Sequence, residues 1–418
     1  MSSLDLTLLY LLAAVIGVVA CRFLRLPPML GYLSAGILIG PHALALAQNT
    51  EGIRHLGEFG VVFLMFVIGL EFSLPKLRAM RRHVFGLGLL QVLLTMGLAT
   101  AGALLVATHL PPAWNLGWQT ALALSGALTM SSTAIVVKLM AERLELESEH
   151  GRRVMGVLLF QDLAVVPLLV VIRALGAPPE ALLKALSVAL AKAVFLVGVL
   201  LYGGPRVMRW WLTLVARRRS EELFMLNLLL VTLGLAWLTE LAGLSLALGA
   251  FIAGMLVSET EYKHQVETDI RPFHDVLLGL FFITIGMSLD WHIVIERWLL
   301  VAVLLALPLA FKLLLVTLLA RGLGATAGVS LRTGLYLAQA GEFGFVLLAL
   351  AQDRGLLPPW LANPVLASMV LSMLATPFIV MYSNAIVRRL VASDWMQQSL
   401  QMTSIARKTI NTSQHVII

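Results

Sequence analysis

Residues 31–38 read Gly31-Tyr32-Leu33-Ser34-Ala35-Gly36-Ile37-Leu38, and residues 249–256 read Gly249-Ala250-Phe251-Ile252-Ala253-Gly254-Met255-Leu256. In both stretches two glycines stand five positions apart, an alanine precedes the second glycine and a leucine follows two places after it. A further glycine follows at a matched distance. Gly69 comes 33 residues after Gly36, and Gly286 comes 32 residues after Gly254. These matched glycines predict an internal repeat.

The composition places the chain in a membrane. Of its 418 residues 59% are hydrophobic and 13% are charged, whereas a soluble domain carries about 25% charged residues. This balance excludes a water-soluble enzyme, a disordered protein and a coiled coil. One cysteine, Cys21, excludes a disulfide framework and a thiolate metal cluster.

Thirteen apolar segments are long enough to suggest membrane spans, since a helix needs about 20 apolar residues to cross a bilayer. They are 6–21, 28–41, 57–71, 84–108, 118–140, 154–173, 180–204, 222–241, 244–258, 272–289, 297–320, 331–351 and 363–387. The sequence therefore predicts an all-α polytopic membrane protein with about 13 transmembrane helices. The short segments 28–41, 57–71 and 244–258 suit tilted or broken helices.

Lysine and arginine alternate along the loops. The odd-numbered loops hold 23 of the 30 basic residues and the even-numbered loops hold four. By the positive-inside rule the odd loops are cytoplasmic, which puts the N-terminus outside and the C-terminus inside. The net charge of +7 therefore reflects membrane topology, and we expect no nucleic-acid partner.

The repeated segments differ by seven places, an odd number, so equivalent helices would cross the bilayer in opposite directions. Segments one to six and eight to thirteen then form an inverted repeat of six helices each, with segment seven as the connector. Inverted repeats are typical of secondary transporters, whose sites lie near the bilayer midplane where discontinuous helices meet.

Three ionisable residues fall near the centres of apolar segments: Asp162, Lys312 and Glu342. Charges in the membrane are costly, and they point to function unless they form structural ion pairs or polar contacts within the bundle. The structural alternative stays open for all three residues. It has the least weight for Asp162 and the most for Glu342.

Two segments contain helix-breaking residues at equivalent places of the two halves. Residues 129–133 form a run of hydroxyl side chains, and in residues 339–344 two glycines flank Glu342. Such residues interrupt helices and can free backbone carbonyls for a cation. The alternative is that small residues allow close helix packing.

Asp162 leads to a chemical hypothesis. Burial and a nearby cation act on the proton affinity of a carboxyl in opposite directions, so one carboxyl can hold either a proton or a metal ion. An alkali cation takes oxygen ligands. The predicted cation and proton site consists of Asp162, Gln161, Thr129, Ser131, Ser132 and Thr133, with Lys312 and Glu342 as supporting charges.

Four stretches resemble the Kef-type members of the monovalent cation:proton antiporters. They are Gln161-Asp162, residues 129–133, residues 341–345 and residues 259–273. The resemblance implies an NhaA-type fold with two broken helices, a homodimer, and an elevator-like movement of a core domain against a dimerisation domain. It also implies potassium as the ion. Many relatives have two adjacent acids where this chain has Gln161-Asp162; the single acid suggests one-for-one exchange and leaves the role of Lys312 open.

The resemblance also implies a division of the chain. Residues 1–393 would form the transport domain. Its dimerisation part would be 1–83 and 208–296, its core 84–179 and 297–390, and its connector 180–207. Residues 394–418 would be a cytoplasmic linker and the start of a Rossmann-type regulatory domain. A regulatory loop would contain Glu259, Glu261, His264, Glu267 and Asp269.

The expected function is exchange of K⁺, or Na⁺, for H⁺ across a bacterial inner membrane by alternating access. No cofactor is expected in this chain; a nucleotide or a glutathione-type ligand would belong to the cytoplasmic domain. Three alternatives stay open: a ligand-gated potassium efflux pathway without proton coupling, an organic-anion symporter, and an intramembrane protease. The sequence contains neither the His-Glu-x-x-His motif nor the second membrane aspartate in a Gly-x-Gly-Asp context that an intramembrane protease would need. We therefore expect no enzyme.

Overall fold

The computed structural model describes residues 3–24, 26, 28–46, 50–71, 80–109, 116–176, 182–242, 246–287 and 289–391. The predicted linker at 394–418 lies outside the described residues. Within them every regular element is a helix. The elements are α1 Ser3–Phe23, α2 Pro28–Ile39, α3 Thr50–Glu71, the π-helical turn η1 His83–Gly88, α5 Leu89–Ala107, α6 Trp118–Thr129, α7 Thr133–Glu142, α8 Glu149–Leu175, α9 Leu182–Ala216, α10 Glu221–Leu241, α11 Leu246–Ser258, α12 Lys263–Met287, α13 Trp291–Glu296, α14 Trp298–Gly322, α15 Ala327–Leu337, α16 Glu342–Asp353 and α17 Pro359–Leu390.

Helices suit this composition because a helix satisfies its own backbone hydrogen bonds in lipid. In the described part of the chain, five helices are long and apolar enough to span a membrane: η1 with α5, α8, α10, α14 and α17. The bent pair α15 and α16 makes a sixth when it is counted as one span. Each predicted segment overlaps a helix or a pair of consecutive helices.

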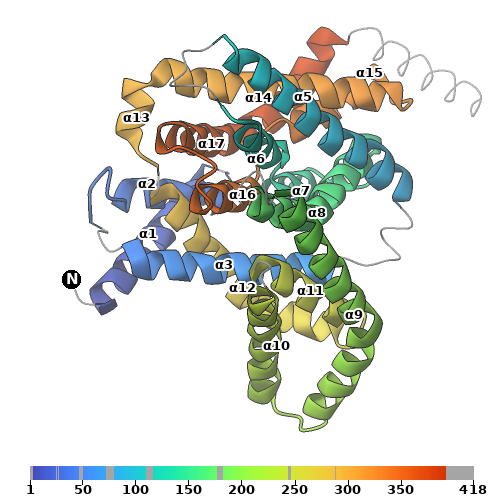
Figure 1. Cartoon of the computed structure of the whole chain (residues 1–418). Helices are drawn as coiled ribbons and strands as arrows, with labels where there is room; N and C mark the ends of the chain where they lie inside the picture. Colours follow the sequence, from blue (N-terminus) through green and yellow to red (C-terminus); the bar gives the residue numbers. More distant parts are fainter. Residues whose placement is uncertain are drawn as a thin grey trace, which may run out of the picture.

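The helices gather in two groups (Figure 1). In the upper part of the view α5 packs on α6 and α14 packs on α15 and α17. In the lower part α3 packs on α11 and α12, and α10 packs on α11. The long helix α9 descends from the end of α8 toward α10.

The glycines of the predicted repeat make two close helix contacts. A Cβ on Gly36 of α2 would overlap the carbonyl oxygen of Ile283 in α12, and a Cβ on Gly286 would overlap that of Leu33. In the same way Gly69 of α3 lies against Phe251 of α11, and Gly254 lies against Phe66. Exchanging α2 with α11 and α3 with α12 turns one contact into the other, which is the relation that the predicted repeat requires.

Both predicted interruptions are confirmed. The helix α6 ends at Thr129, whose hydroxyl donates to the carbonyl of Ser125, and α7 begins at Thr133 after a cap by the Ser132 hydroxyl. The pair α15 and α16 is bent by 46° across residues 338–341. Hydroxyl side chains that bond to nearby backbone compete with helical hydrogen bonding, which explains the first break.

Several helices begin or end at residues other than those of the predicted segments. The predicted connector 180–207 continues as α9 to Ala216, because one proline, Pro205, removes a single backbone donor from a long helix of good helix formers. The predicted regulatory loop is helical from Lys263 onward, since Val266 and Ile270 are buried one helical turn apart. The segment 57–71 is part of a longer helix, and α13 has no counterpart among the predicted segments.

Candidate cation-binding site

The two broken helices cross at their interruptions. A Cβ on Gly341 would overlap the backbone of Ser131, and a Cβ on Gly344 would overlap the carbonyl oxygen of Ala127. Only glycine at these two positions lets the backbones of the two breaks touch. The crossing therefore brings four half-helix ends together: the carbonyl ends of α6 and α15 and the amide ends of α7 and α16.

Lys312 of α14 lies at the two carbonyl ends and is 1% exposed. Its ammonium donates to the carbonyl oxygen of Met130 (2.9 Å), the hydroxyl of Ser131 (3.0 Å) and the carbonyl oxygen of Gln339 (2.8 Å). These three bonds use all three ammonium donors. Helix carbonyl ends carry partial negative charge, so a positive charge is favourable there.

The acids lie at the opposite, amide ends. Asp162 of α8 is 5% exposed, and its Oδ1 accepts from the hydroxyl of Thr133, the first residue of α7, at 3.0 Å. Glu342 is 1% exposed and is the first residue of α16. Partial positive charge at a helix amide end favours a carboxylate. Each half-helix end thus has a side chain of opposite charge beside it.

Gln161 joins the two sides of the crossing. Its Oε1 accepts from the backbone N–H of Ser131 at 2.8 Å, and its Nε2 donates to Oε1 of Gln91 at 2.8 Å. The Ser131 hydroxyl donates onward to the carbonyl of Leu337, in the other broken helix, at 2.8 Å. Gln161, Ser131 and Lys312 therefore form one hydrogen-bonded group.

Of the predicted site residues, the structure places Gln161, Ser131 and Lys312 in this group, and Asp162 and Thr133 form a separate bonded pair at the start of α7. Thr129 and Ser132 belong to the crossing through their helix ends: the Thr129 carbonyl lies 3.3 Å from Gln161 Nε2, and the Ser132 hydroxyl caps α7.

Gln91 and Thr95 of α5 also lie at the crossing, although they are not among the predicted site residues. Gln91 is wholly buried, and its Nε2 donates to the hydroxyl of Thr95 at 3.1 Å. The available signal was a glutamine within the apolar run 84–108, which a buried partner would explain.

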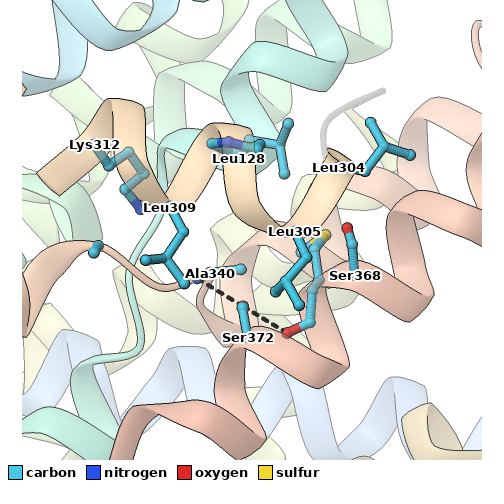
Figure 2. A pocket seen from close by; sticks show the side chains of 11 residues that line it. Leu128, Leu304, Leu305, Leu309, Lys312, Ala340, Ser368 and Ser372 are labelled. Carbon is cyan, nitrogen blue, oxygen red and sulfur yellow. Dashed lines mark hydrogen bonds between the residues drawn. The ribbon is translucent and has the colours of Figure 1, made fainter. Parts of the chain in front are cut away.

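A small cavity of about 20 Å³ lies beside Lys312, with room for about one water molecule. Figure 2 shows Leu304, Leu305 and Leu309 of α14 on one side and Ser368 and Ser372 of α17 on the other. The backbone N–H of Ala340 donates to the Ser372 hydroxyl at 3.1 Å, which attaches the second break to α17.

A second polar cluster, also missed, surrounds Glu145 in the turn between α7 and α8. Its carboxylate accepts from the hydroxyl of Tyr336 in α15 and from Nε of Arg143 at 3.1 Å, and it lies 3.2 Å from Nε2 of His150. Burial alone would raise the pKa of Glu145, but the hydrogen bonds from Tyr336, Arg143 and His150 outweigh burial and hold it below its usual range. The cluster ties the α7–α8 turn to α15.

The predicted regulatory residues form a separate surface cluster. Glu259, Glu261 and His264 are exposed, and Glu267 and Asp269 are half-buried. His264 Nδ1 lies 3.5 Å from Glu267 Oε2. Burial, with the negative charge of Glu221, raises the pKa of Asp269.

Residues 9–382 match the family model described as sodium/hydrogen exchanger, transmembrane. K(+) efflux antiporter 1, chloroplastic, of Arabidopsis thaliana is 40% identical over 98% of this chain and 34% of its own length. A protein named K(+) efflux antiporter KefB from Alkalimonas amylolytica is 40% identical over 90% of this chain and 56% of its own length. The chain thus spans between about a third and about half of these relatives.

The sodium proton antiporter MjNhaP1 of Methanocaldococcus jannaschii has a similar fold. Its structure at pH 8 matches with a TM-score of 0.67 and 15% identity, covering 93% of this chain and all of MjNhaP1. The relatives with high sequence identity are named as antiporters, in agreement with the Kef-type resemblance of residues 129–133, 161–162 and 341–345. The chain belongs to the sodium/hydrogen exchanger family, and within it to the relatives of the Kef-type K(+) efflux antiporters.

Proposed function

We propose that the chain is the membrane portion of a secondary transporter that exchanges a monovalent cation, with K⁺ as the expected ion, for H⁺. The observation that supports this most is Asp162, a buried carboxyl that accepts from Thr133 at the crossing of two broken helices. Family membership supports cation:proton exchange in general. The names of the relatives support potassium.

In the proposed cycle Asp162 holds either a proton or the cation. The Thr133 hydroxyl supplies a second oxygen. Ser131 and Gln161 already bond across the crossing, so their role is to hold its geometry. Thr129 and Ser132 act through the ends of α6 and α7. A proton and an alkali ion compete for the same carboxylate, and that competition couples the two fluxes.

The charges at the crossing favour one-for-one exchange. With both acids ionised, Asp162 and Glu342 contribute two negative charges and Lys312 contributes one positive charge. One monovalent cation, or one proton, then makes the group neutral. A charged group is costly in the low-dielectric membrane interior, so the neutral loaded forms are the ones that move.

Alternating access is proposed as movement of the core, 84–179 and 297–390, against a dimerisation part, 1–83 and 208–296, in a homodimer with an NhaA-type fold. The proposal also includes about 13 membrane spans, an N-terminus on the outside and a location in a bacterial inner membrane. They rest on the positive-inside count and on the KefB relative. A nucleotide or glutathione-type regulator would act on a domain beyond residue 393, near Glu259–Asp269.

The test uses purified protein in liposomes with an internal pH dye. An outward potassium gradient should drive protons inward. Asp162→Asn should abolish this flux while the protein keeps its fold and its oligomeric state. Asp353→Asn, at the exposed end of α16, is the matched control. Potassium flux without proton movement would favour the ligand-gated efflux pathway, and exchange retained in Asp162→Asn would remove Asp162 from the mechanism.

A further inference from the structure

Gln339 has an unusual position in the second break. The residue is 1% exposed, and its backbone carbonyl accepts from Lys312 at 2.8 Å. Its side-chain Oε1 and Nε2 are both enclosed, and neither has a hydrogen-bond partner among the described residues. The amide is therefore buried at the crossing with its donor and acceptor groups unused.

The other buried glutamines of the crossing differ. Gln161 and Gln91 bond to each other, and each also bonds to a hydroxyl or to backbone. Buried polar groups in proteins are nearly always hydrogen-bonded, because an unsatisfied one costs stability. A leucine at position 339 would avoid that cost, so the amide calls for a partner that binds and leaves.

The small cavity beside Lys312 does not supply this partner. Ala338 and Ala340 line it, but Gln339 does not. Gln339 lies in the second break, three residues before Glu342, and its backbone carbonyl accepts from Lys312. The charges of this break favour a cation, because Asp162 and Glu342 together outweigh the single charge of Lys312. Neutral carbonyl oxygens are ligands that replace the hydration shell of K⁺ in proteins. The Gln339 amide oxygen is already shielded from water, so it loses no hydration when it binds K⁺.

On the basis of the proposed function, we infer that Gln339 Oε1 is a further ligand of the transported alkali cation. In the absence of the ion the amide is unsatisfied, and loading the ion satisfies it. Gln339 then contributes to affinity and to the choice among alkali ions, alongside Asp162 and Thr133.

The experiment compares wild type with Gln339→Leu, which removes the amide at similar size, and Gln339→Asn, which keeps it on a shorter stem. Gln352→Leu, the same change near the far end of α16, is the control. Thermal unfolding is measured in choline chloride and in KCl at equal ionic strength. The half-saturating K⁺ concentration is measured from proton flux in liposomes.

In choline, Gln339→Leu should melt at or above the temperature of wild type, because it removes an unsatisfied group. In KCl its stabilisation should be smaller than that of wild type. Its half-saturating K⁺ concentration should rise by about tenfold, with a smaller rise for Gln339→Asn and none for Gln352→Leu.

Two results would overturn the inference. One is an unchanged half-saturating concentration in Gln339→Leu. The other is a lower melting temperature in choline, which would mean that the amide has a permanent structural partner. If wild type itself shows no cation-driven proton flux, the proposed function fails; if wild type exchanges and Gln339→Leu matches it, only the role of Gln339 fails.

Discussion

Lys312→Met removes the ammonium at the crossing and keeps most of the apolar stem. Three hydrogen bonds from a charged donor are lost, each worth about 1.5–3 kcal/mol. Burying the ammonium costs several kcal/mol, which offsets about half of that sum. The expected loss is therefore about 3 kcal/mol of unfolding free energy.

Loss of these bonds also leaves the partial negative charges of two helix ends uncompensated. Without Lys312, the carbonyl ends of α6 and α15 meet with roughly half a negative charge each. An alkali ion can partly replace the ammonium there. The variant should therefore gain more thermal stability from added KCl than wild type does.

Thermal unfolding of purified protein in choline chloride and in KCl measures both effects. Lys192→Met is the matched control, because Lys192 is exposed and makes one long bond, 3.5 Å, to the carbonyl of Ala242. The reasoning is refuted if Lys312→Met melts at the temperature of Lys192→Met. Normal transport by Lys312→Met would limit the residue to packing.

Two further predictions concern the turn after α7 and the glycine of the second break. Glu145→Gln should lower the melting temperature at pH 7, because hydrogen bonds stabilise the Glu145 carboxylate and hold its pKa below that of an unfolded glutamate, about 4.3. This stabilisation is complete above about pH 4.3 and is lost as the pH falls through the lower pKa of the folded state. The difference in melting temperature between Glu145→Gln and wild type should therefore disappear below about pH 4. An equal difference at pH 7 and below about pH 4 would contradict this prediction. Gly341→Ala should abolish transport and cost on the order of 3 kcal/mol, since the new Cβ would overlap the Ser131 backbone, which cannot rotate away. Gly97→Ala, on α5 with no atoms near its Cβ position, should be tolerated, and equal behaviour of the two variants in unfolding and flux assays would rule out the close backbone contact.

The sequence predicts the features that depend on neighbouring residues. The hydroxyl run 129–133 and the glycines around Glu342 predict both breaks, since local chemistry alone interrupts a helix. Asp162 and Lys312 are identified because a charge in an apolar segment is costly wherever the segment packs.

Features that depend on distant partners could not be predicted. Lys312 bonds to Met130, 182 positions away, and the unpaired amide of Gln339 becomes visible only when every neighbour is in place. The family resemblance implied a loop over residues 259–269, but Val266 and Ile270 bury one face from Lys263 onward and that part is helical.

The glycine contacts of α2 with α12 and of α3 with α11 have a mechanical consequence. Sliding one helix along its neighbour would bring a side chain against the facing backbone in place of the glycine, where a Cβ has no room. The two glycine contacts are joined because α3 also packs on α12. The four helices therefore resist sliding in more than one direction. They form a rigid unit, and in the proposed transport cycle the movement would be made by the other helices.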